Sequence, residues 1–250
     1  MALPPAIDSA VDDPRLSAQF LRSVPHSSAG TVTLLGVVHD HPASVARVRL
    51  VCETLEPEVL ALELPPAALP LYRTYAREDR SPPRFGGEMS AALQVSEDAS
   101  VVGIDAPNWS FLRRLCTRLV ADRVSPSVAR RVLSSLGGAT REALACRMAA
   151  TLTHATSMTV TRDDPIEYTC THEDTPACQA DHERAHVAGI QALLAGTDDS
   201  TLTYRDETRE RCMIERLETA RERGDVVAVV GVDHLEALEC GLSEACGSGT

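Results

Sequence analysis

Four short runs of apolar, largely β-branched residues constrain the fold more than any other feature of the chain. They cover residues 31–38 (TVTLLGVV), 58–64 (EVLALEL), 100–105 (SVVGID) and 225–230 (DVVAVV). A run that is apolar at nearly every position is typical of a strand buried on both faces, as in parallel sheets. Segments with apolar residues at helical spacing lie between the runs, for example 43–55 and 206–223. The sequence therefore predicts an α/β fold with a central, mainly parallel sheet flanked by helices.

The length of 250 residues suits a single large α/β domain or two small ones. We expect residues 1–29, which are rich in proline, to form an irregular lead-in, and residues 30–240 to form one domain. Within this domain, residues of about 125–195 are expected to be an extra helical segment, interrupted by a polar loop over 161–181. The Gly- and Ser-rich residues 241–250 are expected to form a flexible tail.

The charge of the chain excludes several classes of function. It has 36 Asp and Glu residues against 24 basic ones, every basic residue is Arg, and the net charge is −12. Without lysine, a Schiff-base enzyme and a P-loop nucleotide site are excluded. The acidic excess argues against binding to nucleic acid or anionic lipid. Acidity combined with Arg in place of Lys predicts a protein adapted to the salt-rich cytoplasm of a halophilic archaeon. Such a protein should lose its structure at low salt.

The sequence also predicts a cytoplasmic protein without a membrane span. No stretch reaches 18 apolar residues, and residues 1–13 lack the positively charged start of a signal peptide. Eight cysteines in 250 residues are too few for a secreted disulfide scaffold, so most should be buried thiols.

Polar residues follow the predicted strands in a recurring pattern. The first and last strands both end in a G-x-x-H motif, Gly36–His39 and Gly231–His234. Because ligand sites in parallel sheets lie beyond the carboxyl ends of the strands, His39 and His234 could share one metal ion as neutral imidazole ligands. Asp40 and His41 follow directly, so one of them extends this site, or Asp40 caps the next helix.

Two acidic residues stand at the ends of the other two predicted strands. Glu63 interrupts the apolar second strand and Asp105 closes the third. A carboxylate in such a position costs free energy unless it is paired, hydrogen-bonded or bound to a metal. Taken singly, Glu63 could pair with an arginine and Asp105 could cap a helix. Their joint occurrence with His39 and His234 favours one shared site.

These motifs, in their order along the chain, resemble the TraB/PrgY/Tiki family, which belongs to the erythromycin-esterase and ChaN-like fold. The resemblance covers about residues 31–115 and 200–238. The G-x-x-H pair and Glu63 match the signature of the family, and Gly86–Met89 matches its G-x-E-M element. Arg209 matches the arginine of its E-R-(D/N)-x-Y-M helix. The chain departs there, because Thr208 replaces the leading Glu and Cys212 replaces the Tyr.

The resemblance implies a metal-dependent hydrolase, possibly a peptidase, that uses a divalent ion such as manganese, cobalt or zinc. His39, Glu63 and His234 would hold the ion, and Glu88 would be a general base or a fourth ligand. Arg209 would stabilise an oxyanion, and Asp105 would orient a histidine. Metal-activated water would attack a peptide or another small amide. The alternative is a non-catalytic regulatory protein that binds a peptide or small ligand in the same crevice.

A second, competing motif lies in the middle of the chain. Residues His182-Glu183-Arg184-Ala185-His186 form an H-E-x-x-H sequence, which on a helix places two imidazoles on one face beside a carboxylate. Upstream, Cys170, His172 and Cys178 could complete a structural zinc site with His182 or His186. The third interpretation is an ordinary solvated helix face. All three remain open from the sequence alone.

Overall fold

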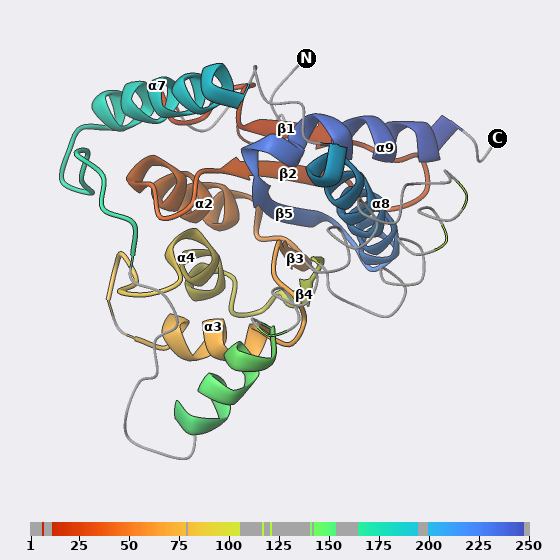
Figure 1. Ribbon diagram of the computed structural model, residues 1–250, viewed down its shortest axis with the longest axis horizontal. Coiled ribbons are helices and arrows are strands. Elements are labelled where there is room, and N and C mark those ends of the chain that lie inside the picture. Colours follow the sequence, from red (N-terminus) through yellow and green to blue (C-terminus); the bar gives the residue numbers. More distant parts are fainter. Residues whose placement is uncertain are drawn as a thin grey trace.

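A five-stranded sheet in the order β1-β2-β5-β3-β4 forms the centre of the computed structural model (Figure 1). Its strands are β1 (Leu21–Val24), β2 (Val32–Val37), β3 (Val59–Leu62), β4 (Ser100–Gly103) and β5 (Val226–Gly231). All neighbouring pairs are parallel except β1 and β2, which are antiparallel. The structure describes residues 7, 12–78, 80–105, 117, 121, 141, 143–153, 165–194 and 200–247.

Helices cover both faces of the sheet and create two separate apolar cores. On one face, α2 (Pro42–Leu55) and α4 (Gly87–Val95) pack on Leu35, Leu60 and Val227. On the other face, α8 (Ser200–Arg221) and α9 (Leu235–Gly247) pack on neighbouring strand residues, among them Leu34, Ala61 and Ala228. Successive strand side chains point to opposite faces, so strands covered on both sides must be continuously apolar. The predicted α/β fold with a mainly parallel sheet is confirmed.

The two ends of the domain differ from the expectation. Residues 1–29 were expected to be irregular, but they contain β1, which pairs with β2 along the edge of the sheet. An edge strand of four residues has one neighbour only, so Arg22 and Ser23 need not be apolar and the sequence signal is weak. The expected flexible tail, 241–250, is helical as far as Gly247, because α9 buries Leu242 against α8.

The described part of the middle segment contains two helices separated by a non-helical stretch over 165–175, which lies within the polar loop expected over 161–181. Residues 143–153 form a helix whose Cys146 and Ala150 pack on α3 (Leu69–Ala76). The helix expected at 182–194 begins earlier, because α7 covers Pro176–Leu194. Apolar residues at helical spacing also predict a helix over 108–122, which falls almost wholly outside the described residues. No helix in the described part of the chain has the length and apolar character needed to cross a membrane.

Candidate metal centre and the neighbouring arginine cluster

The carboxyl ends of β2, β3, β4 and β5 meet at one edge of the sheet, and each is followed by a predicted site residue. His39 comes two residues after β2, Glu63 directly follows β3, and Asp105 follows β4. His234 ends a short 3-10 helix, η1 (Val232–His234), that follows β5. The structure divides these residues between two clusters.

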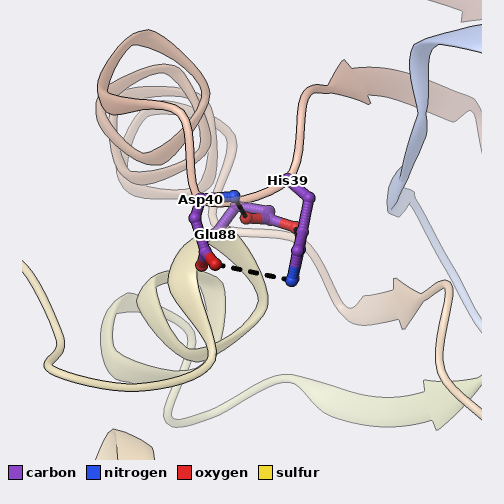
Figure 2. A group of neighbouring side chains, drawn as sticks. All are labelled: His39, Asp40 and Glu88. Atoms are coloured by element: carbon purple, nitrogen blue, oxygen red, sulfur yellow. Dashed lines mark hydrogen bonds and ion pairs between the residues drawn. The ribbon is translucent and has the colours of Figure 1, made fainter. Parts of the chain in front are cut away.

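The first cluster contains His39, Asp40 and Glu88, which lie together in Figure 2. Nδ1 of His39 is 3.0 Å from Oε1 of Glu88, and the backbone N–H of Asp40 donates to Oε2 of Glu88 at 2.9 Å. The other ring nitrogen of His39, Nε2, is 3.5 Å from Oδ2 of Asp40. One possible ligand atom from each residue lies within 4.8 Å of the others, and no other group of three in the described residues meets this criterion. These residues could therefore hold a metal ion.

The backbone around this cluster adopts unusual conformations that bring its members together. Asp40 has a positive φ of 57°, in the left-handed region that Asp tolerates better than most residues. Gly87, which begins α4, has a φ of 40°, and a Cβ atom there would strike Oδ1 of Asp40. Glu88 lies in the first turn of α4, where the helix dipole favours a carboxylate. Together, these features make a compact acidic cradle.

The donor set suits a divalent cation. Two carboxylates and one imidazole combine oxygen and nitrogen ligands, and with a neutral imidazole they carry a charge of about −2. Glu88 is only 1% exposed, and its carboxylate bonds to an imidazole and a backbone N–H rather than to an arginine. A bound cation would offset the cost of burying this carboxylate.

The second cluster surrounds Arg209 of α8. Its guanidinium donates from Nε to Asp105 at 2.9 Å and from Nη2 to Asp105 at 3.0 Å, and Nη2 also donates to Glu63 at 2.8 Å. These carboxylates raise the pKa of Arg209 although burial opposes its charge. Arg209 therefore joins the ends of β3 and β4 to α8, and this bidentate clamp gives it a structural role.

His234 completes the arginine cluster as a second cation. Its Nδ1 lies 2.8 Å from Glu210 and its Nε2 lies 3.4 Å from Glu63. Burial opposes its charge, but the hydrogen bonds to both carboxylates raise its pKa to about 10. His234 is therefore an imidazolium at neutral pH. In that state both ring nitrogens carry protons, so a metal ion could bind here only by displacing a proton and the hydrogen bond that it makes.

The predicted ligand set is thus split. His39 does not meet Glu63 and His234 within ligand distance, and Glu88, expected as a base or fourth ligand, lies beside His39 instead. Glu63 pairs with Arg209, as the ion-pair alternative for Glu63 allows, and Asp105 pairs with the same arginine, whereas the resemblance implied separate roles for Asp105 and Arg209. Asp40, which the sequence left between metal binding and helix capping, belongs to the metal cluster. The N-cap of α2 is His41, which accepts from the N–H of Ala43.

The H-E-x-x-H motif is helical, but its carboxylate is used for packing. Glu183 and Arg47 are completely buried and form a bidentate ion pair at 2.7 Å across α7 and α2. Ser44 donates a further hydrogen bond to Glu183. A carboxylate locked in a buried ion pair is a poor general base.

His182 of the motif belongs to a hydrogen-bonded chain. The N–H of Ala43 donates to Nδ1 of His41, so the proton of His41 is on Nε2 and donates to Nδ1 of His182 at 2.9 Å. Nε2 of His182 then donates to Thr169 at 2.9 Å. Burial and the neighbouring histidines lower the pKa of His41 to about 4. Both ring nitrogens of His182 are thus engaged.

The remaining residues of the proposed second metal site are not brought together. Cys170, His172, Cys178, His182 and His186 form no group of three potential ligands by the 4.8 Å criterion in the described part of the chain. His186 instead faces a different feature, a pocket of about 320 Å³ beside the first cluster. His39 lines the same pocket, so the candidate metal centre and the pocket share one side chain.

Tyr168 is the residue of this region that sequence reasoning missed. Its hydroxyl donates to the backbone carbonyl of His39 at 2.7 Å, and its ring packs edge-on against His41. Burial, with the nearby Asp40 and Glu88 carboxylates, raises its pKa to about 12. Its only sequence signal was an aromatic side chain in an otherwise polar segment.

Searches against models of protein families, curated proteins and solved structures find no match to this chain.

Proposed function

We propose that the chain is a divalent-metal-dependent hydrolase in which His39, Asp40 and Glu88 hold the ion. The observation that carries the proposal is that these three residues gather at the carboxyl end of β2, where His39 also lines a pocket. Such an edge is where parallel α/β sheets bind their ligands. The resemblance to the TraB/PrgY/Tiki family supplies the reaction class, hydrolysis of a peptide or another small amide.

Glu88 and His39 have distinct tasks in this proposal. Glu88 accepts a hydrogen bond from His39 and so fixes the orientation of the imidazole, as carboxylates commonly do for histidine ligands. The side chain of His39 is 55% exposed, so it can reach a substrate in the pocket. A divalent cation supplies Lewis acidity, which polarises a carbonyl oxygen and lowers the pKa of water.

The donor atoms narrow the choice of metal. The cluster offers oxygen and imidazole nitrogen and no thiolate, which suits manganese, cobalt or zinc better than a soft ion such as Cu(I). We propose that the protein works in a salt-rich cytoplasm, so measurements are best made in molar KCl. Mn²⁺, Co²⁺ and Zn²⁺ should be compared under these conditions.

The test of this function is metal binding followed by a cleavage assay. Isothermal titration with Mn²⁺ should give one site per chain, and a peptide library should be cleaved in the presence of the ion. His39→Ala should abolish both. The matched control, His26→Ala, alters a histidine in the turn at the opposite end of β2 and should change neither. Undiminished Mn²⁺ binding by His39→Ala would contradict the proposal.

A non-catalytic binding protein is the second candidate. It is favoured by the arginine cluster, because Glu63 and Asp105 there pair with Arg209, and His234 pairs with Glu63, rather than being directed to a ligand. The two candidates differ in one result. A binding protein would retain peptides from the library at the pocket without cleaving them.

A further inference from the structure

The pocket beside the metal cluster has walls from distant parts of the chain. Its inner wall consists of the ends of β2 and β5, including His39 and Gly231. Its outer wall comes from the segment 165–194, through Ile166, Tyr168 and one face of α7. That segment lies outside the residues that carry the family resemblance, so the resemblance implies nothing about this half of the pocket.

The lining is mainly branched and aliphatic. Six of its side chains are of this kind: Val37, Val38, Ile166, Val187, Ile190 and Val232. Among the described residues, the lining also includes the carboxylate of Asp233, the imidazoles of His39 and His186 and the ring of Tyr168, but no arginine. An apolar group of a ligand would be desolvated favourably against the aliphatic side chains, whereas a carboxylate there would face apolar surface and the like charge of Asp233. The volume of about 320 Å³ is near the lower end for ligand pockets.

Two hydrogen bonds fasten the outer wall to the metal cluster. The N–H of Ile166 donates to Oδ2 of Asp40 at 3.1 Å, and the hydroxyl of Tyr168 donates to the carbonyl of His39 at 2.7 Å. The pocket wall and two of the candidate metal ligands are thus held in one arrangement. A group in the pocket would lie at a fixed position relative to His39.

We propose that this pocket is the specificity subsite of the metal centre and binds a branched aliphatic side chain of the substrate. The inference rests on the proposed function, since it assigns the pocket to the same site. It names the substrate class as a peptide or amide with an apolar side chain, and without a carboxylate, next to the bond that is cleaved.

The probes are three hydroxamates titrated into Mn²⁺-loaded protein, because the hydroxamate group binds the metal and the remainder reports on the pocket. Acetohydroxamate carries only a methyl group beside the hydroxamate, whereas isovalerohydroxamate carries a branched aliphatic group. Succinic acid monohydroxamate carries a carboxylate in place of the branched group, at similar size. We expect isovalerohydroxamate to bind up to about 50-fold more tightly than acetohydroxamate, since three further carbons are buried. The succinic probe should bind more weakly than isovalerohydroxamate.

Two variants on α7 test whether the preference for isovalerohydroxamate arises in the pocket. Ile190→Trp fills the pocket and should abolish the preference for isovalerohydroxamate while leaving the affinity for acetohydroxamate unchanged. Leu193→Trp is the matched control, because Leu193 is 79% exposed on the same helix and does not line the pocket. Both positions are at the helix surface, so both variants should fold.

The outcomes separate the two proposals. If all three hydroxamates bind equally to Mn²⁺-loaded protein, or if Ile190→Trp keeps the preference, the subsite is overturned while the metal centre stands. If neither Mn²⁺ nor acetohydroxamate binds, the metal centre itself fails, and the subsite fails with it.

Discussion

The two acidic clusters at the edge of the sheet differ in their partners and in their exposure. Around Arg209, the guanidinium and the ring of His234 pair with Glu63, Asp105 and Glu210, and the side chain of His234 is 12% exposed. Around Glu88, the partners are the ring of His39 and a backbone N–H, and the side chain of His39 is 55% exposed. The first cluster is held together by an arginine and is largely closed to solvent, whereas the second is open to solvent at His39.

This difference shows how two carboxylates at the same edge of the sheet come to have different partners. Glu63 and Glu88 are both nearly buried acids at the same edge, so position alone does not distinguish them. The distinction comes from α8, which delivers Arg209 to Glu63, whereas the first turn of α4 brings Glu88 to His39. Substitutions in the Arg209 cluster should therefore change mainly the stability of the protein, and substitutions in the Glu88 cluster should change mainly metal binding.

The largest effect is expected from Arg209→Leu. It removes the cation between Glu63 and Asp105, and breaking a largely buried ion pair costs about 3–5 kcal/mol of unfolding free energy. Urea unfolding followed by circular dichroism in molar KCl measures this loss. The control is Asp206→Asn, because Asp206 is a more exposed partner 3.7 Å from Arg209 and its loss should cost under about 1 kcal/mol. Equal effects of the two variants would contradict the structural role of the arginine cluster.

The second prediction pairs Glu88→Gln with Glu63→Gln. Glu88→Gln should lower the affinity for Mn²⁺ about 10- to 100-fold, the usual cost of altering a ligand or its hydrogen-bonded carboxylate. Glu63→Gln should leave that affinity unchanged but lower the unfolding free energy by about 1–3 kcal/mol, because it weakens a charged hydrogen bond to Arg209. Isothermal titration and urea unfolding of both variants provide the two readouts.

The control for this pair is Glu97→Gln, an exposed glutamate just beyond the end of α4. It should change neither quantity. A fall in Mn²⁺ affinity for Glu63→Gln as large as that for Glu88→Gln would show that the clusters act as one site, as the sequence first suggested.

The strands could be predicted, whereas the partners of the strand-end residues could not. Continuous apolar runs locate β2, β3 and β5 within one or two residues, because burial on both faces dictates their composition. Which acid meets which cation depends on how α8 is rotated over the sheet, and that rotation follows from packing of Met213 and Leu217 in the core. The sequence contains no local signal for it.

The same limit applies to the two motifs that suggested metal binding. G-x-x-H places His39 and His234 at one edge, but their ring orientations are set by Glu88 and Glu210, which come from different helices. H-E-x-x-H correctly predicts a helix, yet Glu183 faces Arg47 in the core. A motif specifies spacing along the chain, whereas the role of each of its side chains depends on which residue of a neighbouring helix it contacts.

The third prediction concerns the pH dependence of stability. The pKa of His234 is raised from 6.5 to about 10 in the folded state, so the folded protein binds more protons than the unfolded chain between these values. The stabilisation is therefore complete below pH 6.5 and is lost as the pH rises through 10. His234→Gln should flatten this decline, as measured by urea unfolding from pH 6 to pH 10. An unchanged slope in the variant would remove His234 as the charged partner of Glu63.

The smallest loss of stability is expected from Tyr168→Phe, which tests how segment 165–175 is held against the cluster of His39, Asp40 and Glu88. The variant removes the hydrogen bond from the hydroxyl to the carbonyl of His39 but keeps the ring against His41. One such bond contributes about 0.5–1.5 kcal/mol, so urea unfolding should show a loss in that range. Because segment 165–175 touches the metal cluster and the Arg209 contacts lie elsewhere, the pH dependence assigned to His234 should be unchanged in this variant. If it changed, the Glu88 cluster and the Arg209 cluster would be coupled through segment 165–175 and would not act independently.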